Sequence, residues 1–271
     1  MVVLTASCGG ATPTSGPAPA TAAEVSTPDV TVSLALDRSI TVPGEKVVAR
    51  LTVWNRSPRS VLWRGNGCGL GGAIVVEGPV EAVQPGAVDP APDLRDRLLP
   101  GAERPVDPTS IDPPEVGNRC RLDHGFSLLE PGQHLVHHAA WPATTILGAP
   151  VAPGRYSIIA AFPAIAPGTP IDPPGYRAER DGRPVEVRLR VEVAGPASSL
   201  TAAQAMDRFL ADAAFASWLG IQPPASLAAG LRYRDGTWVL SIAVAGRGVA
   251  SGELSGTGGR PTFRFEHSTL P

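Results

Sequence analysis

The sequence has few aromatic residues, few cysteines, one lysine and no surplus of positive charge. Its 271 residues include 5% aromatics and three cysteines, Lys46 is the only lysine, and the formal net charge is -2. Without a basic surplus the chain lacks the electrostatic pattern of a nucleic-acid-binding protein. Sparse aromatics combined with 30 prolines and 30 glycines argue against a helical bundle and favour short strands joined by turns.

Familiar catalytic motifs are also missing. The sequence has no Gly-x-Ser-x-Gly elbow, phosphate-binding loop or His-Glu-x-x-His pair. Gly67 to Gly72 spell a dinucleotide fingerprint, but a strand-like run follows where a helix would have to begin. Asp112 and Asp172 would suit a calcium ion only if their loops met, and hydrated turn residues are the simpler interpretation. We therefore expect a protein that is not an enzyme and needs no cofactor.

The first cysteine lies in Leu4-Thr5-Ala6-Ser7-Cys8. Small residues before a cysteine resemble a bacterial lipobox, where a signal peptide is removed and the cysteine sulfur is acylated. Residues 1–8 would be the remainder of a signal peptide whose true start lies upstream, because a complete signal needs a basic segment and an apolar stretch. The resemblance implies lipid attachment at Cys8 and export to the outer face of the cell membrane.

Residues 9–28 predict a disordered linker. They are almost entirely Ala, Pro, Thr, Ser and Gly, without apolar periodicity. Such a segment cannot bury enough surface to offset the entropy lost on ordering. It would serve as a flexible tether between a membrane and a folded domain.

Cys68 and Cys120 remain as a pair, and we expect a disulfide between them in an oxidising compartment. Neither belongs to a Cys-x-x-Cys motif, which disfavours redox catalysis or zinc binding. Closing a loop of about fifty residues would stabilise the fold by roughly 4 kcal/mol in the chain-entropy model.

Residues 29–195 predict an Ig-like antiparallel β-sandwich. Residues 30–36 and 185–193 alternate apolar with polar or charged side chains, which is typical of half-buried strands. Pro-Gly turns separate the strands, and about seven such strands indicate a sandwich. A Pro-rich insertion, residues 84–123, interrupts the pattern. The other expected strands are residues 47–54, 60–64, 73–77, 133–141 and 155–162.

The turns of this region carry a resemblance. Val42-Pro-Gly-Glu45, Val53-Trp-Asn55, Leu129-Glu-Pro-Gly-Gln133 and Val151-Ala-Pro-Gly-Arg-Tyr156 look like those of BsuPI-type intracellular proteinase inhibitor domains. They are similar also to Ig-like domains of actinobacterial lipoproteins. The resemblance covers roughly residues 29–195 and rests on turns common to many sandwiches. It implies the Ig-like fold and, as an alternative function, an extracytoplasmic protease inhibitor.

Residues 196–271 predict a small α+β domain, with one helix on a four-stranded antiparallel meander. Thr201 and Gln204 fit a capping box, and an apolar stripe follows them. Phe215 lies off that stripe, which indicates a bend, and Asp235-Gly236 is a strong hairpin signal. The arrangement resembles the PepSY-like group of extracytoplasmic modules, which implies binding or restraint of a protein.

The histidines are the strongest candidates for metal chemistry. His134, His137 and His138 crowd one segment, and His124 precedes it. In a strand His134 and His138 share a face but lie roughly 13 Å apart, whereas one zinc ion needs ligands at about 2 Å. The flanking Pro131-Gly132 favours a strand, so we predict no metal site. The alternative is a metal-dependent hydrolase using His124, His134 and His138.

Trp63, Arg64 and Asn66 are the candidate contact patch, because residues 64–67 make a loop beside Trp63 and next to the expected disulfide. Tryptophan and arginine dominate interface hot spots. The simpler interpretation of Trp54, Trp63 and Trp141, which all end expected strands, is that they lie in the core or at its edge. Together these patterns predict a cell-envelope lipoprotein, tethered to a membrane, that acts as a non-catalytic binding or accessory module. Its partner, an unknown protein or small ligand, is not specified by the sequence.

Overall fold

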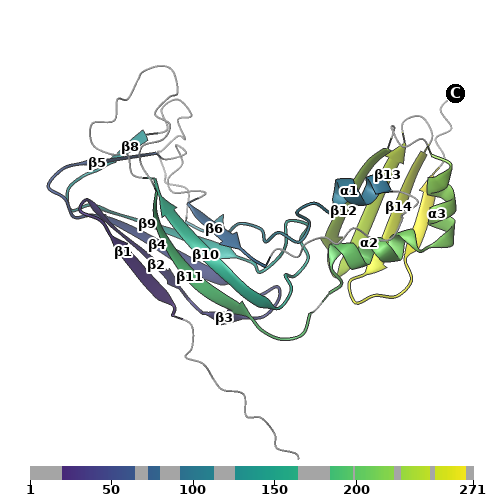
Figure 1. Ribbon diagram of the computed structural model, residues 1–271, viewed down its shortest axis with the longest axis horizontal. Helices are drawn as coiled ribbons and strands as arrows, with labels where there is room; N and C mark the ends of the chain where they lie inside the picture. Colours follow the sequence, from purple (N-terminus) through teal and green to yellow (C-terminus); the bar gives the residue numbers. More distant parts are fainter. Residues whose placement is uncertain are drawn as a thin grey trace, which may run out of the picture.

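The chain forms a β-sandwich followed by a smaller α+β module (Figure 1). The expected fold class, mainly β with an Ig-like sandwich and a C-terminal meander, is confirmed. The computed structural model describes residues 20–64, 73–79, 92–112, 126–163, 184–197, 199–222, 227–244 and 248–266.

Two sheets make the sandwich. The first has the order β1 (Ala22–Ser26), β2 (Val30–Leu36), β4 (Val47–Asn55), β9 (His134–Trp141) and β7 (Thr109–Ser110), all antiparallel. The second has the order β3 (Ile40–Thr41), β11 (Val185–Val193), β10 (Gly154–Phe162) and β6 (Ile74–Glu77), with β3 parallel to β11. A separate pair joins β5 (Val61–Arg64) to β8 (Phe126–Leu129).

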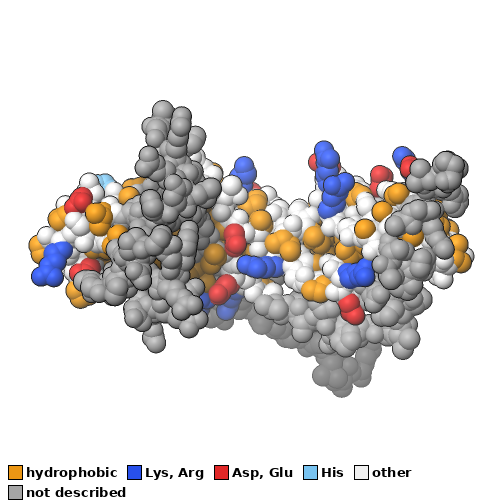
Figure 2. Space-filling model, turned by 90° about the horizontal axis from the view of Figure 1, so that it is seen from above, with side chains coloured by type: hydrophobic (Ala, Val, Ile, Leu, Met, Phe, Trp, Pro, Cys, Tyr) orange, Lys and Arg blue, Asp and Glu red, His pale blue; other side chains and the backbone are white. Residues whose placement is uncertain are grey.

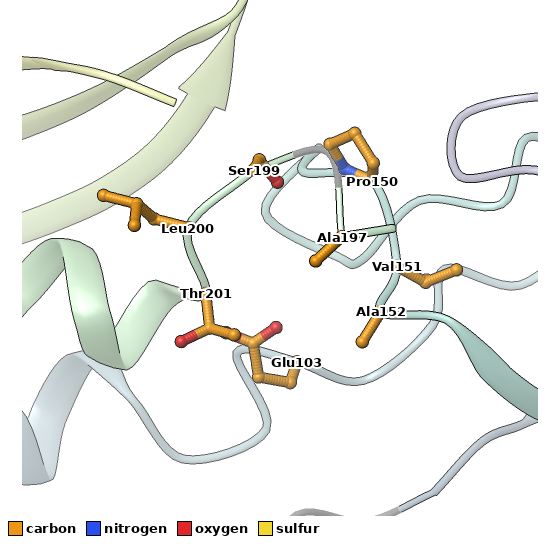
Figure 3. A pocket seen from close by; sticks show the side chains of 8 residues that line it. All are labelled: Glu103, Pro150, Val151, Ala152, Ala197, Ser199, Leu200 and Thr201. Carbon is orange, nitrogen blue, oxygen red and sulfur yellow. The ribbon is translucent and has the colours of Figure 1, made fainter. Parts of the chain in front are cut away.

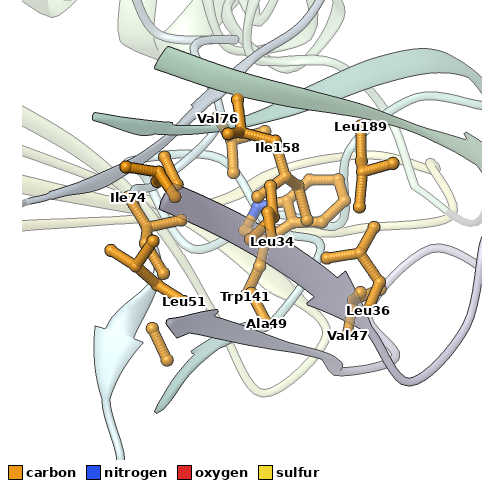
Figure 4. Close-up of a cluster of buried hydrophobic side chains, with 14 of the residues drawn as sticks. Leu34, Leu36, Val47, Ala49, Leu51, Ile74, Val76, Trp141, Ile158 and Leu189 are labelled. Atoms are coloured by element: carbon orange, nitrogen blue, oxygen red, sulfur yellow. The ribbon is translucent and has the colours of Figure 1, made fainter. Parts of the chain in front are cut away.

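The alternation seen in the sequence builds the sandwich core. Leu34, Leu51 and Trp141 of the first sheet pack with Ile158 and Leu189 of the second, and none is more than 4% exposed (Figure 4). Burying apolar side chains of this size stabilises the fold by about 1.5–3 kcal/mol each. The core leaves the alternate residues of each strand on the outer faces, where binding residues can lie.

The predicted linker is wrong over its last residues. Residues 9–28 were expected to be disordered, yet Ala22–Ser26 form β1 and pair along β2. Four of its five residues are exposed. The strand is therefore held by backbone hydrogen bonds to a sheet edge, which leave no apolar pattern in the sequence.

The C-terminal module has two helices where one was expected. The meander follows the order β12 (Leu227–Arg234), β13 (Thr237–Val244), β14 (Gly248–Ser255) and β15 (Thr262–Glu266). Helix α2 (Ala202–Leu210) begins with the predicted Thr201 capping box, and α3 (Ala213–Gly220) begins after Asp212, whose carboxylate accepts from the backbone N–H groups of Ala214 and Phe215. That N-cap divides the helices, because it satisfies the donors of a new first turn.

Part of the Pro-rich insertion belongs to the core of this second module. Helix α1 (Pro92–Leu98) lies beside β12, away from the sandwich (Figure 1). Leu94 and Leu99 are at most 3% exposed and share a core with Phe209 and Trp238. Arg97 donates to the Leu227 carbonyl at 2.8 Å. The sequence predicts residues 84–123 as an insertion in the sandwich. It does not predict the contact with the second module, because composition does not show where a short helix will pack.

The segment between β9 and β10 joins the modules by a close backbone contact. The Tyr233 amide donates to the Leu147 carbonyl at 2.8 Å. The neighbouring Gly148 has a φ of 88°, and a Cβ there would lie 2.8 Å from the Tyr233 carbonyl oxygen. Glycine is therefore required at this joint. Among the described residues, none of the helices is long and apolar enough to span a bilayer.

Candidate functional site

Several predicted site residues lie outside the described residues. These are Cys8, Cys68, Asn66, Cys120, His124 and Asp172. The lipid attachment, the disulfide and the calcium alternative accordingly stay predictions.

The predicted contact patch is wrong for Trp63. Its side chain is 5% exposed and packs on Phe162 in the sandwich core, with ring centroids 5.7 Å apart. The residue lies on β5, and its side of that strand faces inward together with Val61. Arg64 ends the strand. A buried ring cannot contact a partner without unfolding the strand that carries it.

Trp54, which we expected in the core or at its edge, is the exposed member of the sandwich tryptophans. It lies on the outer side of β4 with 43% of its surface accessible. The guanidinium carbon of Arg56 lies 4.4 Å from the centre of a Trp54 ring. Within the described part of the chain Arg56 forms no ion pair. The exposed tryptophan–arginine pair is therefore Trp54 with Arg56, on and after β4, and not the predicted Trp63 with Arg64 of β5.

Buried Asn55 fixes the loop that carries Arg56. Its side-chain amide donates to the Arg59 and Leu129 carbonyls at 2.7 and 2.8 Å. Its carbonyl accepts from the backbone and hydroxyl of Ser57 at 2.9 and 2.8 Å. The amide thus donates twice and accepts twice, so the loop is ordered before any partner binds.

The outer side of β4 and β9 around this pair forms one continuous face, which we call the Trp54 face. Cross-strand pairing sets Trp54 against His134, Thr52 against Val136, and Arg50 against His138. Val136 is 38% exposed. Ile111, 52% exposed, follows β7 and donates its backbone N–H to the His138 carbonyl. The Trp54 face comprises Arg50, Thr52, Trp54, Arg56, Ile111, His134, Val136 and His138.

One carboxylate fastens the edge of this face. Asp112 accepts from the backbone N–H of His138 and from its ring Nδ1, both at 2.7 Å. The ring Nδ1 of His137 lies 3.0 Å from the same carboxylate. The prediction that His134 and His138 share one side of a strand, with His137 opposite, agrees with the register. The contact between Asp112 and His138 was not predicted, because the two residues lie 26 positions apart in the sequence.

Burial and hydrogen bonding set the charges in this cluster. Burial lowers the pKa of His137 below its usual value and outweighs the attraction of Asp112. Burial opposes ionisation of Asp112, but hydrogen bonds from His138 and the charges of both rings together lower the pKa of that carboxyl. Asp112 therefore stays ionised and its lone pairs are engaged by the two histidines.

The described residues contain no group of three or more His, Cys, Asp or Glu side chains able to hold a metal ion. Both Nδ1 atoms of the adjacent histidines are taken by Asp112. His134 lies four positions away along the strand, opposite Trp54. The arrangement anchors the chain after β7 to the sheet edge.

A shallow pocket lies where the modules meet (Figure 3). Its empty volume, including open solvent, is about 260 Å³, and it is lined by Glu103, Pro150, Val151, Ala152, Ala197, Ser199, Leu200 and Thr201. The Glu103 carboxylate accepts from the Ala202 backbone N–H in the first turn of α2. The pocket's one carboxylate is thus used to hold a helix end at the joint.

Comparison with known proteins adds little to this geometry. No protein-family model and no curated protein sequence matches the chain. Among solved structures, the sporulation control protein Spo0M from Bacillus subtilis is similar at a TM-score of 0.28 and 8% identity, covering 89% of this chain and 91% of that one. A likeness at this score carries no argument about function.

Proposed function

We propose that this chain is a cell-envelope binding or accessory protein, held at a membrane through a lipid on Cys8, that works without catalysis. The Trp54 face is its binding surface. This proposal rests most on one observation, the 43% exposed Trp54 with Arg56 held over its ring. Tryptophan and arginine are enriched where interfaces gain most of their energy, and a pre-ordered pair loses little entropy on binding.

The position of β1 is consistent with tethering from the other end of the sheet. Ala22, at the start of β1, pairs with Ala35, whereas Trp54 pairs with Thr31. These two places are four residues apart along β2, or roughly 13 Å. A linker entering at Ala22 would leave the Trp54 end of the sheet free to meet a partner. The PepSY-like module would then be an accessory domain.

Membrane attachment is tested by changing Cys8. In the native host, from a verified upstream start, we expect the parent protein to partition into detergent and to carry acyl chains on Cys8 by mass spectrometry. A Cys8→Ser variant should lose both properties. A soluble, unmodified parent protein would remove the anchor from the proposal.

The binding face is tested separately by photo-crosslinking. A photoreactive amino acid at Trp54 or Val136 should give adducts in the native host, while the same group at Arg190 on the outer side of β11 should give few. Arg190 is a fair control because it is exposed and lies on the opposite sheet. Equal yields at all three positions would contradict a dedicated face.

A protease inhibitor is the second candidate, and one observation favours it. The loop after β4 is exposed at Arg56 and Arg59 yet tied from beneath by Asn55. Inhibitors use such rigid exposed loops because little entropy is lost on binding. Titration against secreted serine and metalloproteases tests this function; lack of inhibition at large molar excess would remove it.

A further inference from the structure

We infer that the partner of the Trp54 face is an acidic polypeptide surface, with carboxylates arranged around an apolar side chain. This inference rests on the proposed binding function and specifies its partner. The argument comes from which charges on the face are available and where its apolar atoms lie.

The centre of the face has available positive charge. Arg50 is exposed, and neither Arg50 nor Arg56 forms an ion pair with any other described residue. Three acids lie around the face. Asp29 precedes β2, and its backbone carbonyl accepts from the Arg56 N–H at 3.1 Å. Glu24 is on the outermost strand β1, and Asp112 is bonded to His137 and His138. A carboxylate approaching this face therefore meets two guanidinium groups that no described acid pairs with, and guanidinium groups bind carboxylates through paired hydrogen bonds.

The opposite sheet offers a built-in comparison. The outer side of β11, β10 and β6 carries equal numbers of acids and bases, and Arg188 donates to Glu77 at 2.8 Å. The charges of this surface balance in number, and Arg188 with Glu77 is the ion pair found there among the described residues. These side chains are Glu77, Arg155, Glu186, Arg188, Arg190 and Glu192. On the side of the molecule that Figure 2 shows, acidic and basic side chains are interspersed.

The apolar part of the face adds an anchoring site. Trp54, Val136 and Ile111 are between 38% and 52% exposed. Val136 pairs with Thr52, two residues before Trp54 on β4, so Val136 and Trp54 are diagonal neighbours on one side of the sheet, and Ile111 flanks the same strand β9. A flat aromatic and aliphatic surface bordered by guanidinium groups matches an apolar side chain with carboxylates on either side.

Binding of defined peptides by the full chain tests this inference. The probes are a peptide of alternating leucine and glutamate and its counterpart with glutamine in place of glutamate. We expect the acidic peptide to bind at least about tenfold more tightly, with an affinity that falls as salt increases. Arg50→Gln, Arg56→Gln and Trp54→Ser should each weaken it by about tenfold. Arg190→Gln, on the opposite sheet where acids and bases are equal in number, should leave it unchanged.

The remaining outcomes overturn the inference. Equal binding of the two peptides, or an Arg190→Gln effect as large as that of Arg50→Gln, would mean that the charges of this face do not select the partner. Tighter binding of polygalacturonate would point to an anionic glycan, and self-association in sedimentation that Trp54→Ser abolishes would point to a second copy. Crosslinking at Trp54 in the native host with no peptide preference would retain the proposed function while removing this choice of partner.

Discussion

At the residue scale, one carboxylate holds the edge of the sandwich together. Asp112 receives the backbone N–H of His138 and faces the Nδ1 atoms of both adjacent rings. His137 is 8% exposed, so it is a buried titratable group that has few other means of balancing a positive charge. Buried groups of this kind link folding to pH, because their protonation differs between the folded and unfolded states.

Stability should fall on mild acidification, and His137 should cause part of that fall. Its pKa is lowered by burial, so the unfolded chain takes up a proton first as the pH drops below about 6.5, and folding becomes less favourable. The lowered pKa of Asp112 matters in more acidic solution. Its contribution to the free energy of unfolding is present above about pH 3.9 and is lost at lower pH. Urea unfolding between about pH 7 and pH 5 measures the first effect.

The matched variants are His137→Gln and His134→Gln. The first removes the buried imidazole and should flatten the pH dependence of the free energy of unfolding. The second removes an exposed ring that lies on the same strand and should leave the dependence unchanged. Identical slopes for the parent and His137→Gln would show that His137 does not couple folding to pH.

At the element scale, α1 shows that the second module is not a separate segment of sequence. Leu94 and Leu99 fill a core otherwise built from residues after 200, apart from Ala102 and Ala149. Arg95 pairs with Asp207 of α2, and Arg97 donates to Leu227. The two leucines enlarge the apolar core of a module that is too small to bury much apolar surface by itself, and the two polar contacts hold the helix in place.

Leu94→Ala should destabilise the C-terminal module by about 2–4 kcal/mol, because it opens a cavity at a side chain that is 1% exposed. Denaturant unfolding followed by tryptophan fluorescence, with Trp238 as the only tryptophan in a Trp54→Phe, Trp63→Phe, Trp141→Phe, Trp218→Phe background, reports the loss. Asp96→Ala changes an exposed position of the same helix and should cost far less. Equal effects would mean that Leu94 does not support that core.

Sequence reasoning succeeded where one element carries its own periodicity. The alternation in Val185–Val193 and the capping box at Thr201 predicted β11 and the start of α2. It failed where the position of a side chain depends on which other element packs against it. Trp54 and Trp63 both end alternating strands, and only the packing of sheets determines that Trp63 meets Phe162 while Trp54 faces solvent. Asp112 likewise reaches His138 through tertiary structure alone.

At the scale of the whole molecule, β1 protects an edge. It covers β2 with five residues, Ala22–Ser26, that bury little of themselves. Unpaired strand edges present rows of N–H and C=O groups that pair readily with other chains. The segment that leads toward the predicted tether therefore also completes the sheet.

Deleting residues 1–26 should produce concentration-dependent association through the exposed edge of β2. Analytical ultracentrifugation measures it. Deleting residues 1–19 retains β1 and should leave the association state of the parent, so the pair of truncations separates loss of the strand from loss of the segment before it. If the variant without residues 1–26 stays monomeric at every concentration, β2 does not need β1 to prevent association.

The position of α1 has a consequence for how the protein is made. The hydrogen bond from Arg97 to Leu227 joins residues 130 positions apart. During synthesis, the leucines of this helix emerge long before the strands that will enclose them, and contacts of such separation form slowly. Until the ribosome has released the meander, the leucines of this mostly charged helix remain without the core that buries them, and such transiently exposed apolar side chains favour misassembly.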